Sequence, residues 1–306
     1  VIKIKKGLDI NLKGKASDVL LNGGKSESYA IVPDYYNGIL PKVVAKVGEK
    51  VKAGSVLMID KNRPEIKFVS PVSGEVTAVN RGEKRKVLSI VVKPDAQIEY
   101  EEFGKKNVAS LQGAEVKEVL LNAGMWPFIK QRPYDIVAAP LDTPRDIFVS
   151  AFYSAPLAPN FDFIVKGQEA DFQTGLNALA KLTNGKVYVG VRSGSVVSGM
   201  KGVEIVEVEG PHPAANVGVQ INHIKPVNKG EVVWTVNPAD VIVIGRLFNK
   251  GVADFSRMVA ITGSETTERG YVKTISGCTI KSLVNGKVLG QEHIRIISGN
   301  VLTGTK

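Results

Sequence analysis

Residues 48–57 read GEKVKAGSVL and residues 70–76 read SPVSGEV, so that two glycine-rich turns flank a short run of Val, Leu and Ile. Turn residues at this spacing bound short strands, and two strands joined by a tight connection form a hairpin. The pattern continues on both sides, with short Val/Ile runs between Gly and Pro at 41–47, 66–69, 75–80 and 87–93. Residues 1–100 are therefore predicted to form a small all-β sandwich.

The two glycine-rich turns resemble those of the biotinyl/lipoyl carrier sandwich, which presents an acceptor lysine at a hairpin tip. Here the tip, residues 60–65, reads DKNRPE, and Lys61 falls about three residues early for a lipoyl lysine. Pro64 fixes φ and removes an N–H, which suits a rigid turn better than a swinging arm. We predict the carrier fold with no covalently bound cofactor. A carrier protein modified at Lys61 is the alternative.

The middle of the chain changes from strand to helix periodicity. Residues 114–122 and 171–183 carry apolar side chains at helical spacing, whereas 146–151 and 186–191 are short apolar runs of the buried-strand type. Strand, crossover helix and strand make a βαβ unit, so residues 101–256 are predicted to form a Rossmann-like α/β domain. Neither G-x-G-x-x-G nor G-x-x-x-x-G-K-[ST] occurs, so no nucleotide phosphate cradle is expected.

The last part of the chain is again β-rich. Strands are expected at 258–262, 272–275 and 294–297, and a short helix is expected to follow the turn at Gly277. Residues 257–306 are predicted to form a small β-grasp domain of the SLBB type, either complete or cut short at its C-terminal end. The expected fold class is therefore multidomain α+β, with sandwich, α/β and β-grasp units in that order.

Composition narrows the range of functions. Of the 306 residues 43% are apolar, and Cys278 is the only cysteine, so an internal disulfide and a cysteine-bound iron–sulfur cluster are excluded. No apolar run approaches the roughly 20 residues of a membrane span, and no signal-peptide pattern follows the N-terminus. The net charge of +10 is scattered without a basic helical stripe or an aromatic RNA-binding motif, so nucleic acid is not expected as a partner. These observations predict a cytoplasmic protein without a metal centre.

Three blocks of sequence resemble one family together. The middle block, residues 124–134, reads GMWPFIKQRPY, the third begins with GPHPAA at 210–215, and the first includes SPVSG at 70–74. In order and spacing they resemble the A subunit of the bacterial sodium-translocating NADH:quinone oxidoreductase across nearly all of the chain. That family continues past the residues matching RIISG at 295–299, so a missing C-terminal part is expected.

The resemblance implies a role in a respiratory electron-transport complex. The complex couples NADH oxidation to reduction of a quinone such as ubiquinone and to Na⁺ export. The family is implied to lie on the inner face of the cytoplasmic membrane, held there chiefly by the membrane-embedded B subunit. NADH, FAD, FMN, riboflavin and the Fe–S centres are implied to bind to partner subunits, and the isolated chain is not expected to be catalytic. A free-standing flavin- or nucleotide-dependent oxidoreductase is the alternative.

The same resemblance implies two quinone-proximal loops. Their matching residues are Tyr36, Gly38, Phe128, Arg132 and Pro133, although Pro127, Ile129 and Gln131 depart from the family pattern. Aromatic rings and an arginine suit a flat apolar slot with donors for carbonyl oxygens. The alternative is that these loops dock another protein of the complex. His212, between two prolines, is either a further quinone contact or a rigid turn.

Overall fold

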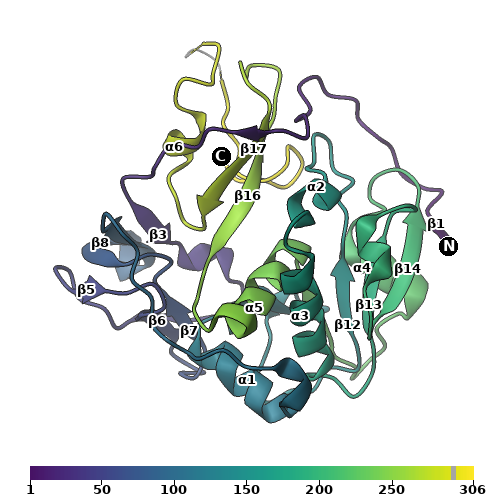
Figure 1. Cartoon of the computed structure of the whole chain (residues 1–306), viewed down its shortest axis with the longest axis horizontal. Coiled ribbons are helices and arrows are strands. Elements are labelled where there is room, and N and C mark those ends of the chain that lie inside the picture. The colour runs from purple at the N-terminus through teal and green to yellow at the C-terminus, as the bar shows by residue number, and fades with distance from the viewer. Residues whose placement is uncertain (291–293) are drawn as a thin grey trace.

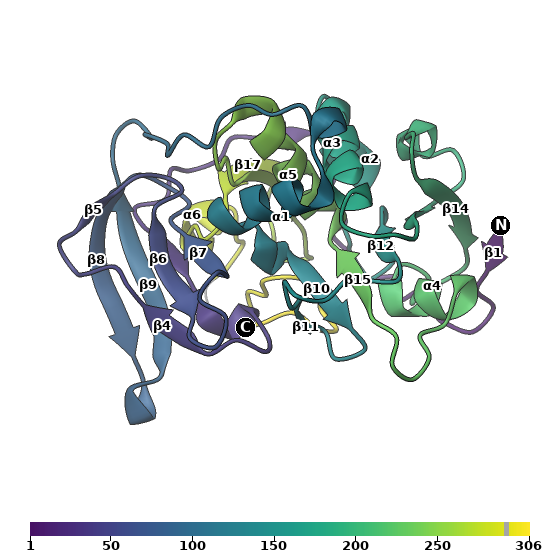
Figure 2. The same cartoon turned by 90° about the horizontal axis from the view of Figure 1, so that it is seen from below.

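The computed structural model describes residues 1–290 and 294–306, in which three bodies of secondary structure pack together (Figure 1). A β-sandwich lies at one end, an α/β layer at the other, and a small β-rich unit lies against both (Figures 1 and 2). The main hydrophobic cluster of the described residues contains Tyr29 of the sandwich and Tyr271 of the C-terminal unit. The three bodies therefore share one core.

Two antiparallel sheets form the predicted sandwich. Their strand orders are β3-β9-β8-β5 and β4-β6-β7, and Leu57, Phe68 and Ile90 are almost completely buried between them. The bounds are β3 Tyr29–Ile31, β4 Pro41–Val43, β5 Lys50–Val51, β6 Val56–Asp60, β7 Lys67–Val69, β8 Gly74–Arg81 and β9 Val87–Pro94, with 3-10 turns at Pro33–Tyr35 and Glu83–Arg85.

Hydrogen bonds to a buried carboxylate hold the hairpin tip that carries Lys61. The buried carboxylate of Asp60 accepts hydrogen bonds from the backbone N–H of Leu40 at 3.0 Å and from Nε of Arg63 at 2.7 Å. Arg63 in turn donates to the carbonyl oxygens of Val137 at 3.1 Å and Gly38 at 2.9 Å. The tip is thus tied to the loop at Gly38 and to the α/β body.

A seven-stranded sheet organises the α/β body in the order β1-β14-β13-β12-β15-β10-β11. The first five strands of this order are parallel, and β10 is antiparallel to both β15 and β11. The bounds are β1 Ile2–Lys3, β10 Ile129–Arg132, β11 Ile136–Val137, β12 Ile147–Ser150, β13 Val187–Val191, β14 Glu204–Glu209 and β15 Val233–Val236.

Helices cover both faces of this sheet. Figure 2 shows α1, α3 and α5 on one face and α4 on the other. The predicted helices 114–122 and 171–183 correspond to α1 and α3, although α3 begins after Gln168 rather than at Asp171. The bounds are α1 Gly113–Asn122, α2 Phe161–Val165, α3 Glu169–Ala180, α4 Val217–Ile224 and α5 Pro238–Lys250, with 3-10 turns at Val108–Ser110, Trp126–Phe128 and Val196–Gly199.

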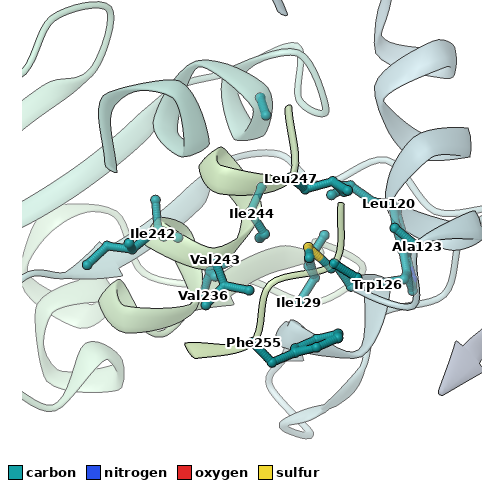
Figure 3. Close-up of a cluster of buried hydrophobic side chains, with 14 of the residues drawn as sticks. Leu120, Ala123, Trp126, Ile129, Val236, Ile242, Val243, Ile244, Leu247 and Phe255 are labelled. Atoms are coloured by element: carbon teal, nitrogen blue, oxygen red, sulfur yellow. The ribbon is translucent and has the colours of Figure 1, made fainter. Parts of the chain in front are cut away.

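Part of the core lies between α5, α1 and β10. Figure 3 shows Val243, Ile244 and Leu247 of α5 near Leu120 of α1 and Trp126. The indole rings of Trp126 and Trp234 meet edge to face at 5.4 Å, and Nε1 of Trp126 donates to the carbonyl oxygen of Ala138 at 2.8 Å. Two adjacent segments, residues 127–128 and 235–236, are thereby fixed in place.

The C-terminal unit is built on a hairpin. Strands β16 (Ser256–Ile261) and β17 (Gly270–Ile275) pair antiparallel, and α6 (Ile280–Val284) packs Leu283 against Ile261 and Val272. The predicted strand at 294–297 is wrong, because these residues have no strand conformation and only the isolated bridge Ser298–Thr305 follows. The free edge of β17 is taken by β2 (Leu20–Leu21) instead.

The N-terminal segment does not join the sandwich that follows it. Figure 1 shows it running from β14, past β17, before it enters β3. Strand β1 pairs with β14, and β2 pairs with β17, so residues 1–25 connect the α/β and C-terminal bodies. Strands of two residues carry no readable alternation, which is why the sequence placed them with the sandwich. Within the described residues, no helix is long and apolar enough to cross a bilayer.

Candidate functional site

A cleft of about 1270 Å³ opens where the three bodies meet. The sandwich contributes residues around β3 and β7, the α/β body contributes β10 and the segments after β12 and β15, and the C-terminal unit contributes β16 and its last turns. Seven aromatic side chains line it: Tyr35, Tyr36, Phe68, Phe128, Phe152, Tyr153 and Phe255. A smaller hollow of about 440 Å³ beside β2 has no aromatic lining.

The open part of the sheet face explains where the cleft lies. Lys130, Thr235 and Phe148 are direct cross-strand neighbours, so their side chains share one face of the sheet. On that face α4 packs Ile221 over Phe148 and Val233 and leaves the region of Lys130 uncovered. Open α/β sheets bind ligands beside the carboxyl ends of their parallel strands, where this cleft lies.

Aromatic side chains from different bodies of the structure form the walls of the cleft. The rings of Tyr36 and Phe68 meet edge to face at 4.8 Å, and those of Phe128 and Phe255 do so at 6.1 Å. Burial, with the nearby charge of Asp240, raises the pKa of Tyr36 to about 12. Burial also raises the pKa of Tyr153, whose hydroxyl lies 3.3 Å from Oδ1 of Asn237. Both phenols are therefore neutral hydroxyl groups at physiological pH.

Charged groups in the cleft are few. Nη2 of Arg257 donates to Oδ1 of Asp240 at 3.0 Å, and Nη1 of Arg132 approaches Oδ1 of Asp135 at 3.4 Å. Nζ of Lys130 lies 5.4 Å from the centre of the Tyr36 ring. Burial lowers the pKa of Lys130, and the charges of Asp135 and Asp240 oppose that effect.

Three of the six predicted site residues line this cleft: Tyr36, Phe128 and Arg132. They come from the sandwich and from the segment 126–132, so the two predicted loops do meet in space. Each predicted loop also contributes a residue that plays a different part in the structure. Those two residues are Gly38 and Pro133.

Gly38 and Pro133 shape the loops and are not among the cleft's lining residues. Gly38 has φ +80°, and a side chain there would approach Cβ of Ile136 to 2.6 Å, so the turn needs glycine. Pro133 follows a cis peptide bond after Arg132 and is exposed. Both residues position their neighbours.

His212 belongs to a separate cluster, as the turn interpretation expects. Its Nδ1 lies 3.0 Å from Oγ of Ser154, its backbone N–H donates to Asp9 at 2.8 Å, and its carbonyl oxygen accepts from Leu8. The peptide bond between His212 and Pro213 is cis. His212 thus anchors the N-terminal segment and does not line the cleft.

The structure adds cleft residues that the sequence did not single out: Lys130, Tyr153, Asp240 and Arg257. Tyr153 and Asp240 follow the buried strands β12 and β15, so the strand-end rule could have found them. Lys130 lies within the block of residues 124–134, in which the aromatic residues and the arginine were singled out and the lysine was not. Arg257 lies at a predicted domain boundary and has no local signal.

Comparisons with known proteins agree along the whole chain. Family models match residues 2–95 (NqrA N-terminal barrel-sandwich hybrid domain), 111–253 (NqrA second alpha/beta domain) and 258–306 (NQRA C-terminal domain). The A subunit of the Na(+)-translocating NADH-quinone reductase of Photorhabdus laumondii is 37% identical over 310 residues, covering 100% of this chain and 69% of that protein. The protein of the same name from Hahella chejuensis is 38% identical, covering 99% of this chain and 69% of that protein.

A solved structure also overlaps with part of the fold. The chain of an NAD⁺-reducing [NiFe]-hydrogenase in the air-oxidized state matches with a TM-score of 0.38 and 10% identity, over 63% of this chain and 45% of that one. The family models together confirm the predicted order of sandwich, α/β and C-terminal domains.

Proposed function

The chain belongs to the family of the Na(+)-translocating NADH-quinone reductase A subunits, and from that premise we propose that it is the peripheral subunit whose cleft receives the quinone. Within the complex it couples NADH oxidation, carried out on partner subunits, to quinone reduction and Na⁺ export. The isolated chain has no catalytic activity of its own in this proposal.

The aromatic cleft is the observation that supports a quinone. A quinone ring is flat and apolar, with carbonyl oxygens that accept hydrogen bonds. Tyr36, Phe128 and Phe255 provide flat apolar surface, and the neutral hydroxyl of Tyr36 provides a donor, whereas the hydroxyl of Tyr153 already donates to Asn237. Small-molecule sites combine an apolar lining with a few convergent polar groups in this way.

We propose further that the subunit holds no redox cofactor of its own. The central domain is proposed to be Rossmann-like on the strength of its five adjacent parallel strands with helices on both faces. NADH, FAD, FMN, riboflavin and Fe–S centres are proposed to reside on partners. Lys61 is proposed to be unmodified, because Asp60 and Arg63 hold its hairpin tip against the loop at Gly38.

Attachment to the membrane is proposed to run through protein, chiefly the membrane-embedded B subunit, on the inner face of the cytoplasmic membrane. Tyr134, 79% exposed and next to Pro133, favours a second role for this loop as a docking contact. The two roles lead to different outcomes, because a docking residue affects assembly and a quinone contact affects turnover.

The test is kinetic and uses the assembled complex. Phe128→Ala and Arg132→Ala are expected to raise the quinone KM or lower quinone turnover about tenfold, about 1.4 kcal/mol. Reduction of an artificial acceptor by NADH should be unchanged, since it precedes the quinone step. Arg85→Ala, at an exposed hairpin tip outside the cleft, is the matched control. Unchanged quinone kinetics in fully assembled variants contradict the proposal, and loss of assembly favours docking.

A further inference from the structure

The charges that line the cleft do not balance. Among its described lining residues are three cations, Lys130, Arg132 and Arg257, and two carboxylates, Asp135 and Asp240. Arg132 pairs with Asp135, and Arg257 pairs with Asp240. Nζ of Lys130 forms no ion pair or hydrogen bond with a described residue and lies 5.4 Å from the centre of the Tyr36 ring. One partly buried cation in the cleft thus has no direct ion-pair partner among the described residues.

A second unmatched donor belongs to Arg257, whose side chain lines the cleft. Nε of Arg257 is the one buried side-chain nitrogen or oxygen in the described part of the chain without a hydrogen-bond partner. Nη2 of the same side chain is held by Asp240, so Arg257 cannot turn to satisfy Nε without losing that bond. Buried donors in native proteins nearly always have a partner, and an exception requires an explanation.

Both unmatched donors belong to one polar cluster around Asp240. The carboxylate of Asp240 binds Arg257 directly. Its charge adds to the effect of burial in raising the pKa values of Tyr36 and Tyr153, and it partly opposes the lowering of the Lys130 pKa by burial. Lys130 comes from β10 and Arg257 from β16, so the α/β body and the C-terminal unit each supply one donor. The aromatic walls stand beside this cluster, with Phe255 two residues before Arg257.

We propose that Lys130 and Arg257 donate hydrogen bonds to the carbonyl oxygens of the quinone and make the cleft bind quinone more tightly than quinol. This inference rests on the proposed quinone cleft and assigns its polar contacts. An ammonium and a guanidinium offer donors only. A quinone oxygen only accepts and is fully satisfied by such donors. A quinol hydroxyl oxygen can also accept from a cation, but its own O–H then needs an acceptor, which neither cation supplies. The tyrosine hydroxyls can donate or accept, so they do not discriminate.

The tryptophans give a direct readout of binding. The chain has two, and the residues that follow them, Pro127 and Thr235, line the cleft. A quinone bound there lies close enough to quench their fluorescence. The probe is a water-soluble dimethoxy-methyl benzoquinone, and its quinol is measured by competition with it. Saturable quenching in the unaltered chain is the expected baseline.

The variants separate donation from packing. Lys130→Met and Arg257→Lys are each expected to weaken quinone binding about tenfold and quinol binding less than about twofold. Arg257→Lys keeps a cation for Asp240 but removes Nε. Lys130→Arg restores donors and should recover most of the quinone affinity. Lys186→Met, at an exposed lysine just before β13, is the control and should change neither.

The outcomes distinguish this inference from the proposal beneath it. If quenching of the unaltered chain is linear and not saturable, the quinone cleft itself is wrong. If binding saturates but both variants keep full quinone affinity, the cleft stands and the two donors are wrong. Equal loss of quinone and quinol affinity means that the residues only pack, which also overturns the inference. Should Arg257→Lys fail to fold, the Lys130 variants decide alone.

Discussion

Arg246 and Asp254 hold in place the short segment that carries Phe255 and Arg257 into the cleft. Arg246 is 4% exposed, and its Nη1 donates to the carbonyl oxygens of Asp254 at 3.0 Å and Ser256 at 2.9 Å. The carboxylate of Asp254 accepts from Lys250 and from the backbone N–H of Ser256. A buried arginine satisfied by fixed carbonyl oxygens fixes the backbone at this point, so the cleft depends on it.

Asp254 should make the free energy of unfolding depend on pH. Burial alone would raise its pKa, but hydrogen bonds from Lys250 and Ser256 and the charge of Arg246 outweigh it and hold the pKa at about 2. A folded pKa below the unfolded value stabilises the fold above about pH 4, and this stability is lost as pH falls toward 2. Asp254→Asn should therefore cost about 1–2 kcal/mol of unfolding free energy at pH 7 after allowance for solvent screening.

Denaturant titrations between pH 7 and pH 3 measure this directly. The gap between the unaltered chain and Asp254→Asn should stay constant down to about pH 5 and then narrow as the pH falls toward 3. Glu65→Gln, at an exposed position on the sandwich, is the control and should keep a constant small difference. A gap that stays constant down to pH 3 would show that Asp254 does not act through its charge.

At the scale of elements, α3 and α5 pack unusually closely. A Cβ at Gly245 would lie 1.7 Å from the carbonyl oxygen of Asp171, and one at Gly175 would lie 2.0 Å from that of Val241. The nearest atom in each case is a backbone carbonyl oxygen, so rotation of a side chain could not relieve the clash. The close packing of α3 against α5 fixes the position of α5, whose residue Asp240 lines the cleft.

Gly245→Ala should therefore destabilise the chain, although alanine is the better helix former by about 1 kcal/mol. We expect a loss of about 3 kcal/mol, because overpacking against backbone forces the helices apart. Gly199→Ala is the matched control, since a Cβ there meets no atom within 4 Å and its φ is not positive. It should change stability by less than about 0.5 kcal/mol. Equal melting temperatures for the two variants would disprove the close contact.

The sequence predicted most elements because their signals are local. The helical stripes indicated α1 and α3, and the glycine-rich turns indicated the sandwich. It did not predict that α4 leaves part of the sheet face open, nor that Arg257 keeps an unmatched donor beside the cluster around Asp240. Both depend on contacts between residues far apart in sequence, which periodicity does not encode.

At the scale of the whole molecule, the N-terminal segment ties separate bodies together. Backbone bonds join Ile4 to Glu209 and Leu8 to His212, while Tyr271 donates to the carbonyl oxygen of Val19. Gly7 packs against His212 so closely that a Cβ would lie 2.1 Å from its carbonyl oxygen. The sequence could not reveal this arrangement, because the partners lie about 200 residues away.

Although the three bodies share one core and residues 1–25 pair outside the sandwich, we predict three folding units with boundaries near residues 100 and 256. Limited trypsin digestion should first cut at the exposed Lys105 and Lys106, in the irregular segment between the sandwich and α1. Mass spectrometry of the fragments would locate the cuts, and denaturant unfolding of the separated fragments would test their independence. A single core that resists cleavage until it unfolds as one unit would contradict the boundaries.

The central claim is that the quinone enters the cleft formed by Tyr36, Phe128 and Arg257. The most direct measurement is photolabelling of the assembled complex with a short-chain benzoquinone that carries an azide, followed by peptide mapping. We expect adducts in the peptides containing Tyr36 and residues 128–132, and we expect excess unlabelled quinone to suppress them. Adducts confined to the other proteins of the complex, or labelling of this chain that unlabelled quinone does not suppress, would contradict the claim.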